Sequence, residues 1–587
     1  MVGKGAGLAA VRHATAQGAL KPNWRIGALA LLLALALLLV AARLFQLQVM
    51  EHNYYASAAR ENQLREENLT SRRGAILDRN GYPLAVSVEA YDVMVEKEVW
   101  QDPTKAAAAA QKLVGIAGGD AAALTATATG SGAFEAIVAR GLTYEQALAV
   151  REAGLPGVRL VEGSRRLHPE GNLAAQLLGF VGLDNQGLTG IEADMETTLS
   201  SGVSKRTIER DGLGNELYLL DVGGSPPQPG ADIVLTIDRY IQRLAERELS
   251  AAVKKHQASG GTIIVLDVKT GAIRAMASFP SFDLANPDLS DESKAGLFRN
   301  LAITDQYEPG SVFKLITGAA GFDSGLVGPQ TPWYDSGVFK VESSTIRNWD
   351  LSANGNQTVT QLLAKSLNTG AAWLSDLLGP ERFYDYVARF GFGEPTGTGL
   401  SGEAAGLVRT PSSDPDGWRA VDLATNSFGQ GLTVTPLQMV AALGAIANGG
   451  LLMRPYVVQE VIGPQGSEIY QPEAIRQAIS PQAARTLMDI MAVVVNSLTP
   501  LYLNVPEYEL AGKTGTASIA KGDGTYKDTY ISSFAGVAPL DDPSIAVLVK
   551  IDEPKDVPWG SVVAAPAFAR IAKAVLTYYN IPSRGSE

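Results

Sequence analysis

The sequence predicts an α+β protein with a single N-terminal transmembrane helix, an elongated module after it, and a C-terminal domain in which helices flank an antiparallel sheet. Three observations support this prediction. Residues 26–42 form an uncharged run dense in Leu and Ala. A Gly/Pro-rich stretch at 222–230 marks a boundary in the chain. Beyond it, strand-like apolar runs come in hairpin-like pairs with helical patterns at both ends, which is typical of an α+β domain.

The N-terminal apolar run is suited to anchor the chain in a membrane. As a helix its 17 residues extend about 25 Å, and the apolar pattern continues to Val49, so we predict a membrane span over residues 26–49. The preceding 25 residues contain basic but no acidic side chains, which predicts a cytoplasmic tail at 1–25 and an external body. The sequence VAA at 40–42 also fits a signal-peptide cleavage site, so removal of the anchor is the alternative.

The composition excludes several classes of chemistry. The 587 residues include no Cys, which rules out disulfides, thiolate metal sites and a cysteine nucleophile. No His lies beyond His256, so the remainder of the chain cannot build a Ser-His-Asp triad, and we expect no multi-His metal site there. The net charge is −12, and the acidic excess lies outside the first 50 residues, which gives no electrostatic case for nucleic-acid binding.

The chain between the anchor and the Gly/Pro-rich stretch reads as one module, residues 50–221. Residues 51–70 are polar and helix-prone, and Asn80-Gly81 between two apolar runs is a hairpin-turn signal. Residues 104–150 are rich in Ala, Gly and Thr and predict small helices on a surface module. Residues 222–231 are the predicted linker to the next domain.

The predicted C-terminal domain spans residues 232–581, and a short tail follows at 582–587. Strands are expected at 233–237, 262–268, 272–278, 510–517, 532–538 and 545–551. Helices are expected at 241–253, after Gly310, at 359–365, at 436–448 and at 566–579. The helix at 436–448 carries the clearest end signals, with Thr435 as N-cap, Pro436 at its first position and Gly449 after its end.

Ser311 and Lys314 lie one helical turn apart in an unusually apolar segment. The helix after Gly310 is apolar nearly all round, so it should be buried. Burial lowers the pKa of a lysine, and a neutral lysine amine can remove the proton of a neighbouring serine hydroxyl. The helix N-terminus also favours a developing oxyanion. The pair therefore predicts a serine nucleophile that is activated without histidine.

Each short motif of this chemistry occurs twice in the chain, so context has to separate the copies. A second Ser-x-x-Lys lies at 518–521 with no buried helix behind it. A second Ser-x-Asn lies at 352–354 in a polar loop, and a second Lys-Thr-Gly at 269–271 forms the turn between two strand-like runs. On their own, a capping Ser, a turn Asn or a surface Lys would be ordinary structural residues.

The copies in the expected contexts form an ordered set. The set follows a pattern known from penicillin-binding proteins and class A β-lactamases. That pattern implies that Lys513 and the hydroxyls of Thr514 and Thr516 would bind a substrate carboxylate, and that the N–H groups of Ser311 and Thr516 would bind an oxyanion. Ser366 and Asn368 would relay a proton to a leaving amine and hold a substrate amide. The candidate catalytic residues are Ser311, Lys314, Ser366, Asn368 and Lys513, and the candidate substrate-binding residues are Thr514, Gly515 and Thr516.

This ordered triplet of motifs resembles that of penicillin-binding proteins and class A β-lactamases. Over nearly the whole chain the sequence is similar to class B penicillin-binding proteins, the monofunctional peptidoglycan D,D-transpeptidases. The resemblance includes RLFQLQV at 43–49, RGAILDRNG at 73–81, LPGV at 155–158, GLTGIE at 187–192, YEPGS at 307–311 and SFAGVAP at 533–539. The sequence QLLGFVG at 176–182 looks more like the division (septal) branch than the elongation branch.

The resemblance implies a pedestal or dimerisation-like module at 50–221 and a penicillin-binding transpeptidase domain at 232–581. It implies a single-pass protein of the bacterial plasma membrane, with an extracytoplasmic catalytic domain. Ser311 would attack the D-Ala-D-Ala donor of a stem peptide, an amine of a second stem would take the acyl group, and β-lactams would trap Ser311. No metal or organic cofactor is implied. The implied partners are a polytopic glycosyltransferase of the shape-elongation-division-sporulation family and divisome proteins.

Two departures from related patterns and two alternatives remain. The middle residue of the Ser-x-Asn motif is Leu367 rather than the Asp of β-lactamases, and no repeat module follows the transpeptidase region. A β-lactamase or D,D-carboxypeptidase would share the acyl-enzyme chemistry and use water as acceptor. A non-catalytic β-lactam sensor or scaffold would be expected to carry a broken motif, whereas all three motifs are intact here. The sequence does not give the acceptor amine, the oligomeric state or β-lactam affinities.

Overall fold

The computed structural model describes residues 24–130, 135–200, 203–209, 228–498, 501–521 and 525–584. The first 23 residues of the predicted cytoplasmic tail, residues 222–227 of the predicted linker and the last three residues lie outside the described residues. The chain divides into two compact units, 1–69 with 203–226 and 70–202 with 227–587. Each unit is described by itself below.

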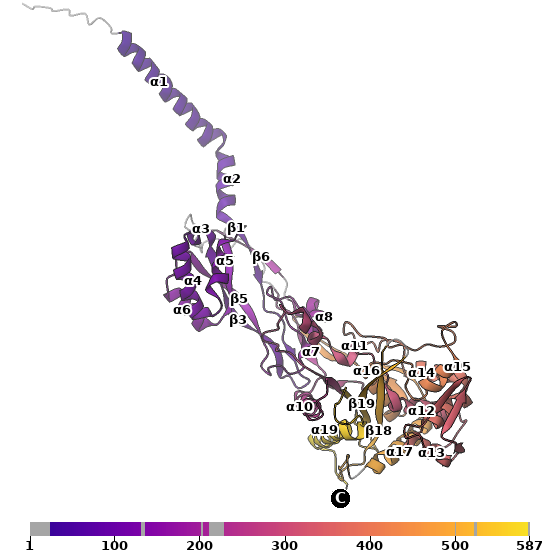
Figure 1. The fold of residues 1–587 in the computed structure, drawn as a ribbon. Coiled ribbons are helices and arrows are strands. Elements are labelled where there is room, and N and C mark those ends of the chain that lie inside the picture. Colours follow the sequence, from indigo (N-terminus) through magenta and orange to yellow (C-terminus); the bar gives the residue numbers. More distant parts are fainter. Residues whose placement is uncertain are drawn as a thin grey trace, which may run out of the picture. The chain divides into compact units, whose positions relative to one another are not determined.

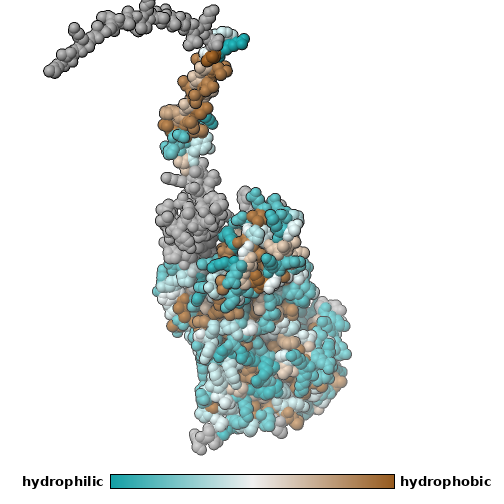
Figure 2. All heavy atoms as spheres, turned by 90° about the vertical axis from the view of Figure 1, so that its left-hand side faces the viewer, coloured by the Kyte–Doolittle hydropathy of each residue, from teal (hydrophilic) through white to brown (hydrophobic). Residues whose placement is uncertain are grey.

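The first unit contains the predicted membrane span. Helix α1 (Trp24–Phe45) continues into a π-helical turn, η1 (Gln46–Met50), and the two together are long and apolar enough to cross a membrane. The side chains of α1 are exposed, and Figure 2 shows them as a brown apolar surface. Helix α2 (His52–Gln63) follows, but the helix-prone stretch ends earlier than expected, because residues 64–70 form strand β1 (Leu64–Thr70) and pair with β6 (Val203–Glu209).

The second unit begins with the predicted hairpin. Strand β2 (Ile76–Leu77) pairs antiparallel with the long strand β3 (Pro83–Glu96), and Gly81 in the turn has a φ of +82°. Strand β3 pairs on its two edges with β4 (Glu135–Leu142) and β5 (Val158–Leu167). The prediction of small helices alone over 104–150 was wrong for β4, because pairing with β3 outweighs the local composition.

Short helices complete this module. The helices before residue 153 pack with β3, β4 and β5 around a core that includes Trp100 and Leu113, whereas those at 175–199 belong to a separate core that includes Leu177 and Ile191. Their bounds are α3 (Lys97–Trp100), α4 (Pro103–Ala117), α5 (Ala121–Thr129), α6 (Tyr144–Glu152), α7 (Ala175–Leu178), α8 (Gly190–Asp194) and α9 (Glu196–Leu199).

A buried ionic cluster links the start of this unit to α8. Arg73 is buried and lies 2.6 Å from Glu192 and 2.7 Å from Glu196, and Arg166 lies 2.6 Å from the other Glu192 oxygen. Removing one partner of a buried ion pair is costly because it leaves a buried charge uncompensated. The cluster therefore fixes the segment that leads into β2.

The central sheet of the predicted C-terminal domain has five antiparallel strands in the order β18-β19-β20-β8-β9. Their bounds are β18 (Ala511–Ala520), β19 (Tyr526–Ala538), β20 (Ile545–Asp552), β8 (Gly260–Asp267) and β9 (Ile273–Phe279). The predicted hairpin at 262–278 is confirmed as β8 and β9. Strands β18 and β19 are labelled near the centre of this domain in Figure 1.

Helices cover both faces of this sheet, as the sequence predicts. Helices α10 (Arg239–Lys255) and α19 (Ala565–Tyr578) pack on one face, and α16 (Pro436–Ala447) packs on the other. The period-2 alternation of strand side chains explains the two cores. In β8, Ile263 points into the core with α10 and α19, whereas Ile264 points into the core with α16. Although α19 belongs to a stretch apolar enough to span a membrane, that stretch is mostly buried and serves as a core helix.

The remaining elements belong to the chain after residue 231. The helices are η2 (Glu292–Phe298), α11 (Leu301–Thr304), η3 (Gly310–Phe313), α12 (Lys314–Asp323), α13 (Val359–Ala364), α14 (Asn368–Arg389), α15 (Ala420–Asn426), α17 (Pro481–Leu498) and α18 (Gly560–Val563). The strands are β7 (Asp232–Leu235), β10 (Pro332–Asp335), β11 (Val338–Val341), β12 (Ser344–Arg347), β13 (Gly355–Thr358), β14 (Leu451–Met453), β15 (Val458–Gly463), β16 (Gly466–Ile469) and β17 (Ala474–Gln477).

Candidate active site

Ser311 lies in the short 3-10 turn η3, which runs directly into the buried helix α12. Gly310 before it has a φ of +57°, and a Cβ there would approach the carbonyl oxygen of Thr516 to 3.1 Å. Only glycine therefore combines this backbone conformation with close packing on β18. The sequence predicted a helix beginning at Ser311, and the structure begins it with a tighter 3-10 turn.

Lys314 is fully buried at the start of α12 and contacts three residues of the ordered set. Its Nζ lies 3.1 Å from the Oγ of Ser311, 3.2 Å from the Oγ of Ser366, and 2.7 Å from both the carbonyl oxygen of Ser366 and the Oδ1 of Asn368. Burial, and secondarily the nearby Lys513, hold the pKa of Lys314 well below its ordinary value. Both effects disfavour the charged amine.

The contacts of Lys314 also orient the neutral amine. A neutral amine has two N–H donors and one lone pair. The two shortest contacts are to the Ser366 carbonyl oxygen and the Asn368 Oδ1, which accept but cannot donate. When these acceptors take both N–H groups, the lone pair is left for a hydroxyl proton such as that of Ser311. The geometry therefore suits proton removal from Ser311.

Ser366 lies in the three-residue connection between α13 and α14, with a φ of +58°. A non-glycine residue in this left-handed region is strained, and such strain concentrates at functional sites. Its Oγ lies between the two buried amines, 3.2 Å from Lys314 Nζ and 2.9 Å from Lys513 Nζ. A single hydroxyl therefore bridges the two lysines.

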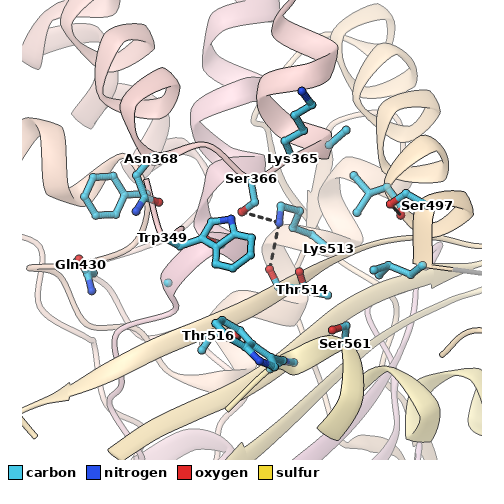
Figure 3. Close-up of a pocket in the computed structure, with 18 residues that line it drawn as sticks. Trp349, Lys365, Ser366, Asn368, Gln430, Ser497, Lys513, Thr514, Thr516 and Ser561 are labelled. Atoms are coloured by element: carbon cyan, nitrogen blue, oxygen red, sulfur yellow. Dashed lines mark hydrogen bonds between the residues drawn. The ribbon is translucent and has the colours of Figure 1, made fainter. Parts of the chain in front are cut away.

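Lys513 is buried on β18 and also contacts the carbonyl oxygen of Thr514 at 3.2 Å. Figure 3 shows its amine between Ser366 and Thr514. Burial lowers the pKa of Lys513 to about 7. Two buried lysines with lowered pKa values therefore share one hydroxyl.

A cleft of about 380 Å³ opens over this cluster. Of the eight sequence-predicted residues, six line the cleft: Ser311, Ser366, Asn368, Lys513, Thr514 and Thr516. Lys314 is fully buried rather than part of the cleft lining, and it contacts Ser311 and Ser366. Gly515 faces away, where a Cβ would lie 2.3 Å from the Oγ of Ser533 and 2.9 Å from Val312. Gly515 is therefore a packing requirement of the strand rather than a contact residue.

The duplicate motifs lie outside the cleft lining. The Lys-Thr-Gly at 269–271 forms the turn between β8 and β9, where Thr270 hydrogen-bonds Asp267. In the second Ser-x-Asn motif, Asn354 donates to the buried Asp335. Ser518 lies toward the end of β18, in a strand rather than at the start of a helix. The copies that were set aside because of their sequence context are therefore the ones that lie outside the cleft lining.

Sequence reasoning missed the aromatic residues at the cleft. Trp349 and Trp559 line it from two separate loops, are 60% and 45% exposed, and have ring centroids 5.4 Å apart. Trp349 extends over the cleft in Figure 3, whereas Lys365 points away from the Lys513 amine. Phe428 and Gln430 also line the cleft. The sequence around a single Trp in a polar loop does not indicate that the Trp will line a cleft, because only the tertiary fold brings the two loops together.

No cluster of three or more His, Asp or Glu side chains suited to hold a metal ion occurs within the described residues. The polar side-chain groups that line the cleft include hydroxyls, amines and the amides of Asn368 and Gln430. These groups suit acyl transfer through a serine ester.

Comparison with known proteins places these features in a family. Residues 261–573 match the family described as "Penicillin binding protein transpeptidase domain", and residues 68–235 match "Penicillin-binding Protein dimerisation domain". Stage V sporulation protein D of Bacillus subtilis is 34% identical over 558 residues, covering 94% of this chain and 85% of that protein. Peptidoglycan D,D-transpeptidase FtsI of Escherichia coli is 32% identical over 571 residues, covering 95% and 92%.

Solved structures show the same architecture. A peptidoglycan synthetase from Bifidobacterium adolescentis aligns with a TM-score of 0.71 at 26% identity, covering 89% of this chain and 98% of that one. Penicillin binding protein 3 of Mycobacterium tuberculosis in complex with aztreonam aligns with a TM-score of 0.67 at 28% identity, covering 88% and 98%. The α+β prediction is confirmed by these alignments.

Proposed function

This chain belongs to the penicillin-binding proteins that combine a dimerisation domain with a transpeptidase domain, and from that premise we propose that it is a membrane-anchored serine D,D-transpeptidase. Its substrates are peptidoglycan stem peptides, and β-lactams are its inhibitors. The observation that carries the proposal is the convergence of Ser311, Lys314, Ser366 and Lys513 on one cleft. We further propose residues 50–221 as the pedestal and 232–581 as the catalytic domain.

The contacts among Ser311, Lys314 and Ser366 suggest a route for the protons during acylation. Lys314 removes the Ser311 proton as the Oγ attacks the carbonyl carbon between the two terminal D-alanines. The N–H groups of Ser311 and Thr516 stabilise the oxyanion, and one such donor contributes about 10²–10³ in rate. The C–N bond then breaks, the leaving amine takes a proton relayed through Ser366, and an ester on Ser311 remains. Lys513 with the Thr514 and Thr516 hydroxyls binds the terminal carboxylate, and Asn368 holds the substrate amide.

Transfer reverses the same steps with a second amine. The amine of a neighbouring stem peptide attacks the ester carbonyl, its proton returns through the lysine-hydroxyl cluster, and Ser311 leaves with a proton. The product is an amide cross-link. A β-lactam acylates Ser311 in the same way, but its leaving nitrogen stays tethered to the acyl group.

The lifetime of the penicillin adduct separates the transpeptidase from a hydrolase. We expect a fluorescent penicillin to form a covalent adduct that persists through gel electrophoresis, because a transpeptidase passes its acyl group to an amine rather than to water. A β-lactamase or carboxypeptidase would turn the adduct over rapidly. Incubation with paired stem peptides should yield the cross-linked dimer by mass spectrometry. Absence of both adduct and dimer would favour the scaffold alternative.

The pKa values predict a bell-shaped pH dependence of acylation. Lys314 must be neutral to accept the proton, and its lowered pKa places the rising limb well below the ordinary pKa of lysine. Lys513 must be charged to bind a carboxylate, so its loss of charge near its pKa of about 7 produces the falling limb. We expect the acylation rate at low penicillin concentration to show both limbs. Lys513→Arg should remove the falling limb, and a flat profile in the unmodified protein would contradict these roles.

We propose that the anchor is retained, with the N-terminus in the cytoplasm and the catalytic domain outside the plasma membrane. The support is the exposed apolar helix α1 and the basic residues before it. In spheroplasts, a tag at residue 1 should be protected from external protease, while a tag after residue 587 should be digested. Mature protein without the N-terminal tag would instead indicate cleavage near residue 42.

We also propose a septal role and two classes of partner. The support for the role is the resemblance of residues 176–182 to the division branch. The proposed partners are a polytopic glycosyltransferase of the shape-elongation-division-sporulation family, meeting the anchor and pedestal, and divisome proteins. A fluorescent fusion should localise to the septum, and a lateral-wall signal would favour the elongation branch.

A further inference from the structure

Three lysines are buried in the described part of the catalytic domain, and the mechanism above uses only two of them. The third, Lys550, lies on β20, where the neighbouring core is aliphatic. A buried charge in such a place is expensive unless it is paired. The burial of Lys550 therefore requires a separate explanation.

Lys550 is paired on two sides. Its Nζ lies 2.9 Å from Asp305 Oδ2 and 2.5 Å from Asp552 Oδ1, and 5.2 Å from the ring centroid of Tyr307. Burial alone would lower the pKa of Lys550, but the two carboxylates outweigh it and raise the pKa. Lys550 is thus a fixed cation, unlike Lys314 and Lys513, whose pKa values are lowered.

One carboxylate belongs to the segment that leads to the nucleophile. Asp305 follows α11, and the chain then runs through Tyr307 and Gly310 to Ser311. The backbone of Tyr307 exchanges two hydrogen bonds with Val434, of 3.0 and 2.9 Å, and the Gly310 N–H donates to the Gly429 carbonyl at 3.0 Å. These bonds hold one side of the segment, and the Lys550 ion pair ties its start to the central sheet.

The other carboxylate belongs to a second wall of the cleft. Asp552 ends β20, and the loop after it leads to Trp559 at the cleft. This loop begins with Glu553 at a φ of +50°, and its Pro558 carbonyl accepts a hydrogen bond from Ser532 Oγ at 2.6 Å. Lys550 therefore bonds to the start of the nucleophile segment and to the start of the Trp559 loop.

Stability alone does not explain this arrangement. Apolar residues of similar volume often replace buried ion pairs without loss of stability. What an apolar residue cannot do is hold two separate chain segments at fixed directions from one point. A small misplacement of a nucleophile by a distant change costs about 10²-fold in rate.

We propose that Lys550 is a positioning residue for acylation, which holds the 305–311 segment and the 553–559 loop at fixed positions relative to each other at the cleft. The inference rests on the proposed function, because its readout is the reaction of Ser311. Lys550 does not touch substrate and takes no part in proton transfer. It acts through the placement of Ser311 and of Trp559.

The test separates placement from stability with the variants Lys550→Met and Asp305→Asn in the full chain. Both changes break part of a buried ion pair, so we expect some loss of melting temperature. In the protein that remains folded at the assay temperature, the acylation rate constant at saturating penicillin should fall about 10- to 100-fold. The double variant should acylate no more slowly than the slower single variant, because both changes break the same Lys550–Asp305 ion pair. Lys294→Met, which removes a surface lysine 2.7 Å from Asp288, is the matched control and should acylate normally.

The outcomes are distinct. Normal acylation by both Lys550→Met and Asp305→Asn overturns the proposal, as does slower acylation that only follows the loss of folded protein. If Lys550→Met fails to fold, Asp305→Asn decides, because it leaves Lys550 paired with Asp552. If the unmodified protein forms no adduct, the proposed function fails instead, and the two failures are therefore distinguishable.

Discussion

Replacing Ser311 with Ala is expected to abolish covalent labelling by a fluorescent penicillin. The Oγ of Ser311 is the hydroxyl that both lines the cleft and lies 3.1 Å from the buried Lys314 amine. Without it, no ester can form, so the adduct band should vanish rather than weaken. Because Ser311 is only partly buried and Ala suits a helical turn, the melting temperature should stay close to that of the unmodified protein.

The chain supplies its own matched control for this experiment. Ser518 begins the second Ser-x-x-Lys motif, yet it lies outside the cleft lining on β18. Ser518→Ala should therefore label as strongly as the unmodified protein. Persistent labelling of Ser311→Ala, or loss of labelling in Ser518→Ala, would show that the nucleophile has been misassigned. Growth of a depleted strain on Ser311→Ala would favour a scaffold.

The parts of the site that sequence predicts are those that depend on short-range chemistry. Ser311 and Lys314 are three residues apart on one helical turn, so their spacing and the apolar surroundings predict their contact. The burial that lowers the pKa of Lys314 follows from an all-apolar helix. Similarly, the strand pairs at 262–278 and 532–551 follow from apolar runs separated by turns.

The parts that sequence misses depend on contacts between distant segments. Trp349 and Trp559 are 210 positions apart, and their proximity arises only when two loops meet at the cleft. Lys550 lies in an otherwise apolar strand, where its role depends on Asp305, 245 residues away. The strand at 135–142 was missed for the same reason, because it forms by pairing with β3 in a segment whose composition favours helices.

Replacing Lys314 with Met is expected to separate proton transfer from binding. Met fills the buried volume but cannot accept the Ser311 proton, and general-base catalysis contributes about 10²–10⁴ in rate. The acylation rate constant should fall by that factor, while the concentration of penicillin that gives half-maximal rate changes little. The rising limb of the pH profile should disappear with it, because that limb reports loss of the Lys314 proton.

Stability should respond weakly to this change because two effects oppose each other. Removing a buried amine relieves its desolvation, but it leaves the Ser366 carbonyl and Asn368 Oδ1 with one partner fewer, at about 1–3 kcal/mol for each buried group left unpaired. Lys365→Met is the matched control, since Lys365 is adjacent to Ser366 but points away from the Lys513 amine in Figure 3. If Lys314→Met acylates as fast as Lys365→Met, then Lys314 is not the base, and Lys513, 2.9 Å from Ser366, becomes the group to test next.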